Sequence, residues 1–354
     1  MSTRPLPILM VALAGCLALD GCSTPAFTLR IDAGESVDVG IVRPADVAPT
    51  PTNDVPVTPI DAITTAADVS VPPVDRPATT IDVGAPMDVG TTTPGTVPAS
   101  IARALPAFDA ATLARVRAIR ADGLRRGNRP NVFTKIGDSI TEAGGFLQDI
   151  GDGYFDLAGY DWLMPTLTYF NSVHFADGRS SFNRYSLSAM GGWVSSQPLD
   201  GDPNSPLRNE LAATRPLYGI VMIGTNDLDR STLAVYTANL TRIVTIMEGN
   251  GTVPIVSTIP DRNDQATPAA RVPSFNDAIR ALARTRNLPL IDYWLTMHDL
   301  PAHGVSDDGI HPSIWRNMGD PQATDFRDVA MQYGYNMRNL TALLMFDRLR
   351  SLPQ

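Results

Sequence analysis

Apolar residues recur along the last two-thirds of the chain in two alternating patterns, one typical of buried strands and one typical of amphipathic helices. Short β-branched and apolar runs predict five strands, at residues 131–134, 182–189, 217–223, 253–259 and 288–293. Helices are predicted at residues 109–127, 231–248, 274–286 and 335–349. Because strands that alternate with helices form parallel sheets covered on both faces, we expect a three-layer α/β/α sandwich with a five-stranded parallel sheet.

Two long segments carry no clear pattern. Residues 142–181 are rich in aromatic residues, glycine and aspartate, which is typical either of a lid or pocket wall or of a local insertion with its own small core. Residues 313–333 are rich in Met, Asp and Arg, and we expect them to be an insertion that shapes one rim of a site at the sheet edge.

The first 22 residues have the composition of a secretory signal peptide. One basic residue, Arg4, precedes an apolar run at residues 6–19, which is too short to span a bilayer comfortably. Cys16 and Cys22 each follow small residues in a context that resembles a bacterial lipobox, so either could carry a lipid. We therefore expect an exported protein, periplasmic or at the cell surface, with a lipid anchor in the membrane.

Residues 23–105 are rich in Pro, Thr and Asp and hold a single aromatic residue, Phe27. So little large apolar surface cannot offset the entropy of ordering the chain, which predicts a disordered tether. A folded domain is then expected over residues 106–354, which is long enough for a hydrophobic core.

Charge and cysteine content exclude several classes of function. Residues 1–105 hold 11 acidic and 5 basic side chains, so most of the net charge of −9 lies in this region. Neither this region nor the rest of the chain has the basic surface of a nucleic-acid-binding protein. Because no cysteine follows Cys22, the folded domain has no disulfide and no thiol nucleophile.

Four of the predicted strands are followed by residues that suit acyl-transfer chemistry. These residues are Ser139, Gly192, Asn226 and the pair Asp308 and His311. The carboxyl ends of parallel strands meet at one edge of a sheet, where open α/β sheets bind ligands. We therefore expect these side chains to lie close together.

Each group has a role in such chemistry. The Ser139 hydroxyl is a poor nucleophile unless the His311 imidazole takes its proton, and Asp308, three residues earlier, can orient that ring. The Asn226 amide and the backbone N–H groups of Gly192 and Ser139 can stabilise an oxyanion.

At this point the sequence resembles the SGNH, or GDSL-type, hydrolases. The resemblance rests on four ordered blocks: Gly-Asp-Ser-Ile-Thr at 137–141, Gly192, Gly-Thr-Asn-Asp at 224–227 and Asp-Gly-Ile-His-Pro at 308–312. It implies a flavodoxin-like fold, no metal or other cofactor, a triad of Ser139, His311 and Asp308, and an oxyanion hole from Ser139, Gly192 and Asn226. It covers about residues 130–350.

Two positions depart from the family pattern. The second block lacks the usual Asn ahead of its glycine, so Gly191 is an alternative to Gly192 as the oxyanion donor. Lys135, the only lysine of the chain, lies on a strand that is usually apolar, and we expect it to pair with a carboxylate such as Asp227 or Asp229.

Composition alone also suggests a metal site. His298, His303 and His311 lie near Asp299, Asp307 and Asp308, but their spacing matches no familiar ligand pattern. We therefore expect no metal.

The sequence thus predicts an exported serine esterase whose substrate is a small ester or an acylated polysaccharide, and carbohydrate deacetylation is one option. A lysophospholipase or short-chain acyl esterase would use the same mechanism, and the family resemblance also admits acyl transfer to a sugar. Exposed Trp162 and Trp193 would favour sugars, and a long apolar stripe along the cleft would favour lipids. A non-catalytic carbohydrate- or surface-binding module is the alternative from another class.

Overall fold

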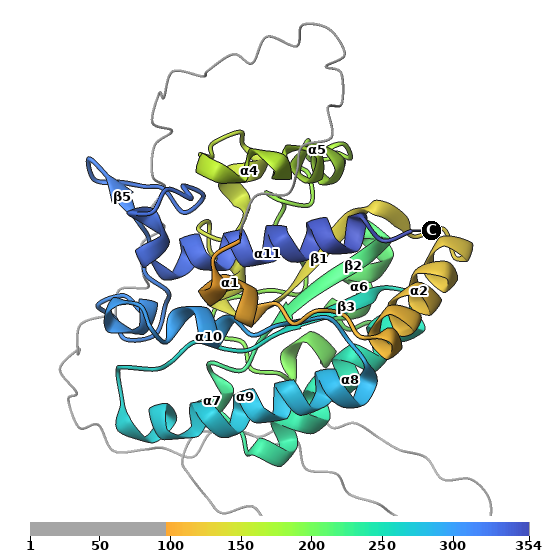
Figure 1. Ribbon diagram of the computed structural model, residues 1–354. Coiled ribbons are helices and arrows are strands. Elements are labelled where there is room, and N and C mark those ends of the chain that lie inside the picture. The colour runs from red at the N-terminus through yellow and green to blue at the C-terminus, as the bar shows by residue number, and fades with distance from the viewer. Residues whose placement is uncertain (1–96, 354) are drawn as a thin grey trace, which may run out of the picture. The chain divides into compact units, whose positions relative to one another are not determined.

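The structure is a computed structural model, and it describes residues 97–353. These residues form a compact unit (Figure 1). Residues 1–96, which include the predicted signal peptide, both cysteines and most of the predicted tether, lie outside the described residues. No helix among residues 97–353 is long and apolar enough to cross a membrane.

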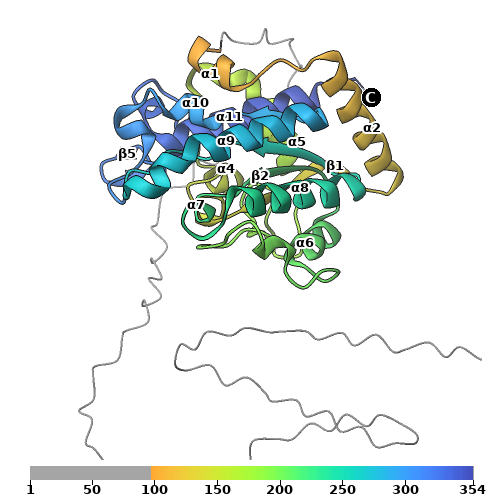
Figure 2. The same ribbon diagram turned by 90° about the horizontal axis from the view of Figure 1, so that it is seen from below.

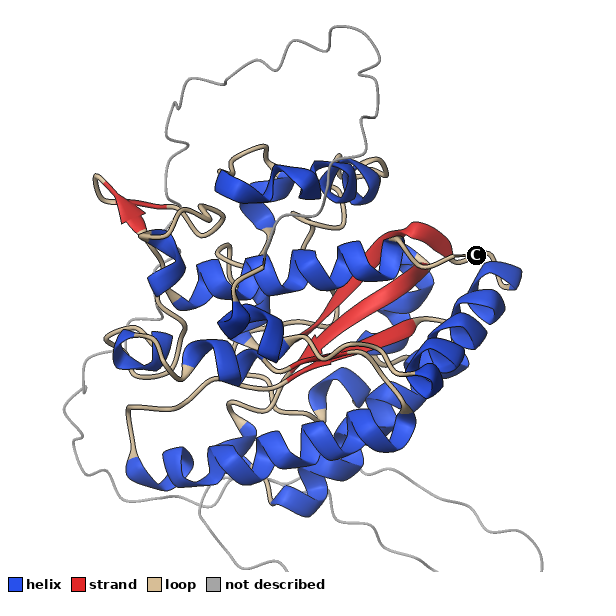
Figure 3. Ribbon diagram, in the orientation of Figure 1, coloured by secondary structure: helices blue, strands red, loops and turns tan. Residues whose placement is uncertain are grey.

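A parallel sheet forms the centre of this unit (Figure 3). Its neighbouring strands follow the order of the chain: β1 (Arg129–Gly137), β2 (Pro216–Met222), β3 (Val253–Ser257) and β4 (Leu290–Ile291). Every residue of β2 and β3 is buried. The α/β class expected from the sequence is therefore confirmed.

Helices cover both faces of the sheet. In Figure 2, α6 (Pro206–Thr214) and α8 (Leu233–Gly249) lie on one side of it and α11 (Gly334–Arg350) lies on the other. Phe346 of α11 stacks on Phe133 of β1, with ring centroids 4.3 Å apart. On the opposite face, Gly219 of β2 leaves room for Met247 of α8, because an added Cβ would lie 2.5 Å from the Met247 methyl group. The layers are thus held by side chains that fit against the strands.

Of the remaining long helices, α2 (Ala110–Arg125) agrees with the prediction and α9 (Ala266–Arg286) does not. Asp109 caps α2, its carboxylate accepting the N–H of Thr112 at 2.7 Å. The helix predicted at 274–286 is longer: α9 begins eight residues earlier and continues through Pro273. Proline removes one backbone donor from a helix, so the sequence pattern placed the start of the helix after it.

The expected strand at 182–189 is not formed, and the main sheet of the described residues has four strands instead of five. This segment runs beside β1 but pairs with it through only one bridge, between Gly137 and Ala189. Side chains satisfy its backbone instead: the Glu210 carboxylate accepts the Leu187 N–H at 2.9 Å, and Lys135 Nζ donates to Phe182 O at 2.8 Å. A strand ladder is therefore replaced by side-chain hydrogen bonds.

Lys135 does not pair with Asp227 or Asp229, so that prediction is wrong. Its ammonium is buried and donates to a carbonyl, and burial lowers the pKa of Lys135 to about 7. Asp227 instead accepts hydrogen bonds from the N–H and hydroxyl of Ser195, at 2.8 and 2.6 Å.

Residues 142–181 are not an insertion with its own separate core. They form the short helices α4 (Gln148–Gly151), η2 (Ala158–Leu163) and α5 (Met164–Asn171), which follow α3 (Ser139–Glu142). Phe170 of α5 is fully buried, and its ring centroid lies 5.5 Å from that of Phe133 and 5.2 Å from that of Phe346. The segment therefore contributes to the main core.

The folded unit extends further toward the N-terminus than expected. Helix α1 (Ala99–Ala104) lies inside the range predicted as tether, yet Ile101, Ala104 and Leu105 are buried. The Asp292 N–H donates to Ala104 O at 2.7 Å, which fixes α1 to the segment that leads into α10 (Tyr293–Met297). Residues 97–105 thus belong to the folded domain, whose predicted start was residue 106.

Candidate active site

Ser139 is the first residue of α3, directly after the turn that ends β1. Gly137 permits this turn because an added Cβ would lie 2.2 Å from Thr141 Oγ1 and 2.4 Å from Met222 O. Asp138 caps α3, its carboxylate accepting the Ile140 N–H at 3.1 Å. Asp138 thus holds the serine turn, and Ser139 itself is partly exposed.

Asp138 is completely buried, and burial raises its pKa to about 6. The hydrogen bond from Ile140 N–H and the nearby Arg338 guanidinium act in the opposite direction. This carboxyl group therefore ionises far less readily than an exposed aspartic acid.

His311 and Asp308 lie in one loop that faces Ser139. His311 Nε2 is 2.9 Å from Ser139 Oγ, and His311 Nδ1 is 2.6 Å from Asp308 Oδ2. Gly309, between them, has φ +72°, and an added Cβ would lie 2.6 Å from the backbone nitrogen of Asp264. Glycine is required at this position because it adopts a left-handed conformation in close contact with a neighbouring loop.

The second oxygen of Asp308 organises its own loop. Oδ1 accepts the N–H groups of Ile310 and His311, at 2.8 and 2.9 Å, and the Ser306 hydroxyl at 2.9 Å. Partial burial alone would raise the pKa of Asp308, but these bonds and the His311 ring outweigh it and hold the pKa well below its usual range. Asp308 is therefore an anion that can orient the imidazole and stabilise its protonated form.

Of the two adjacent glycines, Gly191 lies close to the serine. An added Cβ on Gly191 would be 3.9 Å from Ser139 Cβ, and the Gly191 N–H donates to Glu142 Oε2 at 2.6 Å. Gly192 has φ +76°, and its carbonyl accepts a hydrogen bond from Arg230 at 2.9 Å. Of these two N–H groups, that of Gly191 is already bound to a carboxylate.

Asn226 follows β2 and directly precedes α7 (Asp227–Arg230). One N–H of its side-chain amide donates to Trp193 O at 3.0 Å, and this bond ties Asn226 to the glycine segment. An amide has two donors, so this contact leaves the other for a ligand.

A cavity of about 610 Å³ opens at His311. Residues from both ends of the segment 313–333 line it, in agreement with the prediction that this segment shapes one rim of the site. They include Ser313, Arg316, Gln332 and Tyr333. Of residues 142–181, only Ala143 lines this cavity.

Sequence reasoning missed two residues beside the serine. Arg338 of α11 is buried and donates to Ile140 O at 2.6 Å and to Thr141 Oγ1 at 2.9 Å, while Glu142 binds the Gly191 N–H. Neither belongs to a local motif, because the partners of Arg338 are about 197 positions away and those of Glu142 about 49.

Comparison with known proteins identifies the class. A model of the GDSL-like lipase/acylhydrolase family matches residues 136–314, half of the chain. The match includes Ser139, the glycine pair, Asn226 and the loop of Asp308 and His311. The chain belongs to this family, and it is a hydrolase that acts on ester bonds.

Solved structures of low sequence identity are similar to this chain. A GDSL-like lipase from Bacteroides thetaiotaomicron is 13% identical, with a TM-score of 0.40 over 67% of this chain and 98% of that one. A lipase/acylhydrolase from Enterococcus faecalis is 20% identical, with a TM-score of 0.39 over 61% and 94%. An acetylxylan esterase from Geobacillus stearothermophilus is 16% identical, with a TM-score of 0.39 over 62% and 94%. No curated protein matches the chain.

Proposed function

We propose that this hydrolase is an exported serine esterase that uses Ser139, His311 and Asp308 as its catalytic triad. The observation that carries the proposal is the unbroken chain of short contacts from Ser139 Oγ to His311 Nε2, and from His311 Nδ1 to Asp308 Oδ2. This is the geometry in which a histidine activates a serine and a carboxylate holds the histidine.

The mechanism follows from these contacts. Ser139 Oγ attacks the ester carbonyl while His311 Nε2 takes the hydroxyl proton, and Asp308 stabilises the imidazolium that results. The tetrahedral intermediate collapses when His311 returns the proton to the departing alcohol. Water, activated by the same imidazole, then attacks the acylated Ser139 and releases the carboxylic acid.

The first test compares the full wild-type chain with Ser139→Ala on p-nitrophenyl acetate. Without the nucleophile, kcat should fall by about 10³-fold or more, and a fluorophosphonate probe should label only the wild type. Equal turnover by both proteins would refute the triad. Absence of labelling and turnover in both, together with binding of polysaccharide, would favour a non-catalytic binding module.

The oxyanion donors in this proposal are the N–H groups of Ser139 and Gly192 and the amide of Asn226. Gly191 is the alternative, but the Glu142 carboxylate already accepts its N–H, and a negatively charged oxyanion would have to displace that carboxylate. In this scheme, Glu142 braces the glycine segment against α3.

A pair of Glu142 variants separates the two donors. If Gly192 is the donor, Glu142→Ala removes the brace and should lower kcat about tenfold, whereas Glu142→Gln keeps an acceptor and should retain most activity. If Gly191 is the donor, Glu142→Ala frees its N–H and should raise kcat. Steady-state kinetics on p-nitrophenyl acetate distinguish these outcomes.

The substrate we propose is a short acyl ester, such as an acetyl group, on a carbohydrate. Hydroxyl, amide and guanidinium groups of Ser306, Ser313, Gln332 and Arg316 line part of the cavity at His311, beside apolar residues such as Val305 and Ile314. This mixed lining supports the choice because it suits a small acyl group on a polar ligand. Trp162 and Trp193 do not provide the exposed aromatic platform that would have favoured sugars, because both are partly buried against the core.

A lysophospholipase or short-chain acyl esterase is the second candidate, because three large apolar side chains are exposed near the glycine pair. They are Tyr185, Leu187 and Met190, each more than half exposed. The ratio of kcat/KM on acetylated oligosaccharides to that on lysophosphatidylcholine decides between the two substrates.

Export and lipid anchoring belong to the same proposal and rest on the sequence of residues 1–22. Mass spectrometry of the membrane-associated protein should find a diacylglyceryl group on Cys16 or Cys22 as the first residue. An unmodified amino terminus would refute the anchor and leave the esterase mechanism untouched.

A further inference from the structure

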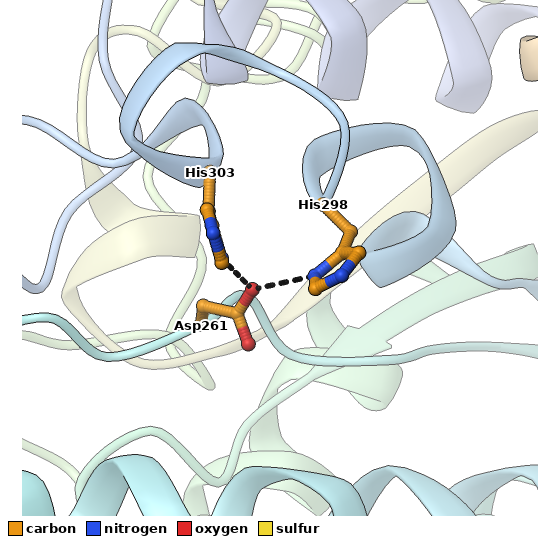
Figure 4. Close-up of side chains that lie close together, drawn as sticks. All are labelled: Asp261, His298 and His303. Atoms are coloured by element: carbon orange, nitrogen blue, oxygen red, sulfur yellow. Dashed lines mark hydrogen bonds and ion pairs between the residues drawn. The ribbon is translucent and has the colours of Figure 1, made fainter.

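A cluster of one carboxylate and two imidazoles lies outside the proposed triad. Figure 4 shows the side chains of His298 and His303 directed toward the carboxylate of Asp261. The distance from Asp261 Oδ2 to Nδ1 is 3.3 Å for His298 and 2.7 Å for His303. One ligand atom from each of the three residues lies within 4.8 Å of the others.

We propose that Asp261, His298 and His303 bind a divalent transition-metal ion, with Zn²⁺ as the probe. Zinc binds imidazole nitrogen and carboxylate oxygen at about 2.0–2.2 Å, which places the ligands of a tetrahedral site about 3.3 Å apart. The distance from His298 Nδ1 to Asp261 Oδ2 already has this value. The distance from His303 Nδ1 to the same oxygen is shorter by about 0.6 Å. Water would supply the remaining ligand.

Neighbouring groups orient these ligands as second-layer contacts do in metal sites. The Trp294 indole N–H donates to Asp261 Oδ1 at 2.7 Å, so the other oxygen faces the two histidines. The His298 ring stacks on the Trp294 ring, with centroids 4.3 Å apart. Both histidine side chains are 46% exposed, so an ion can reach them from solvent.

The backbone at His303 is also unusual. Ala302 and His303, in η4 (Pro301–Gly304), have φ values of +49° and +54°, a left-handed conformation that non-glycine residues seldom adopt. Asn263 supports this turn by donating its side-chain amide to Ala302 O at 2.9 Å. A metal bond to His303 would stabilise the same strained conformation.

The ion would hold the catalytic loop from two sides. Two residues after Asp261, the Asn263 N–H donates to Gly309 O at 2.7 Å. Immediately after His303, Gly304 O accepts the Ser313 N–H at 2.8 Å, and Val305 pairs with Pro312. The loop that carries Asp308 and His311 lies between these contacts, so the ion has a structural role there and is not part of the ester chemistry.

The sequence did not lead to this site. In the sequence, His298 and His303 lie near Asp299, Asp307 and Asp308, whereas the structure brings them to Asp261, 37 and 42 positions away. The proposal therefore departs from the expectation of no metal.

The test is zinc titration by calorimetry on the full chain with Cys16 and Cys22 both changed to Ser, because free thiols bind zinc. We expect one zinc per chain and at least tenfold weaker binding in His298→Asn, His303→Asn and Asp261→Asn. Asn suits the left-handed conformation at 303, and at 261 it retains an oxygen for Trp294. His174→Asn, at an exposed histidine elsewhere, is the matched control and should bind as the parent does.

A second measurement separates this site from the triad. Zinc should raise the thermal midpoint by several degrees in the parent and in His311→Asn, but not in His303→Asn. Loss of zinc binding in His311→Asn, unchanged binding in His303→Asn, or no binding by the parent would each overturn the proposal. None of these readouts depends on turnover, so a failed esterase assay would leave them valid.

Discussion

At the scale of single residues, Asp138 is a carboxyl group buried beside the serine, with a free-energy cost to the fold when it is ionised. Its side chain is fully buried, and Oδ2 has no hydrogen-bond partner among the described residues. Only Oδ1 is satisfied, by Ile140 N–H. An ionised carboxylate in such surroundings destabilises the fold, which explains why its pKa is raised to about 6.

This raised pKa makes stability depend on pH in a definite direction. Between about pH 4 and 6 the folded chain holds a proton on Asp138 that the unfolded chain has lost, so rising pH favours unfolding. Asp138→Asn cannot titrate, and its stability relative to the wild type should increase by about 2–3 kcal/mol between pH 4 and 7.5. Urea denaturation at several pH values measures this difference.

The comparison has a built-in control. Asp308 has a lowered pKa, so its stabilising effect is lost as the pH falls below the pKa of an aspartic acid in the unfolded chain. This loss is the same in the wild type and in Asp138→Asn, so it cancels in the difference between them. A stability difference that stays constant from pH 4 to 7.5 would show that Asp138 does not titrate in this range.

Also at this scale, the residues of the proposed triad could be predicted from the sequence, whereas the residues that surround them in the structure could not. Ser139 and the pair Asp308 and His311 belong to short motifs, and residues close in the chain suffice to suggest them. Arg338 approaches the serine turn from the last helix, through contacts that only the folded chain creates. Nothing in its local sequence distinguishes it from a surface arginine of an amphipathic helix.

At the scale of elements, Glu210 of α6 fixes the segment that replaces the fifth strand. Its carboxylate is fully buried and accepts hydrogen bonds from the Leu187 N–H, the Thr134 hydroxyl and the Arg184 guanidinium. The prediction of a strand at 182–189 failed because the apolar pattern does not show that a buried glutamate will take the backbone donors. This segment leads directly to the glycine pair.

Glu210→Ala should therefore affect both stability and turnover. Removing one partner of a buried ion pair costs about 3–5 kcal/mol, and the freed segment should misplace the glycine pair and lower kcat more than tenfold. Glu248→Ala is the control, because Glu248 is also an acidic residue of a helix that forms ion pairs with arginine, here Arg115 and Arg286, and its side chain is only 7% exposed. It should lower stability with little change in kcat, and an equal loss of kcat in both variants would contradict the role of Glu210.

At the scale of the whole molecule, the alternation of strands and helices was enough to predict the layers, because a parallel sheet buried on both faces requires continuous apolar strands. The start of the domain was less predictable. Helix α1 lies in a proline-rich composition and contributes few apolar residues, and only its contact with the α10 region shows that it is part of the core.

The contact between Ser139 and His311 joins residues 172 positions apart. It can form only after β1 and the segment that follows β4 have both packed into the fold. Because the entropy cost of closing so long a loop is high, we expect the site to form late in folding. Under the proposed mechanism, a chain with a reactive Ser139 is a chain that has completed its fold. The fraction of molecules that react with a fluorophosphonate would then measure the fraction that has folded correctly, without a separate assay of structure.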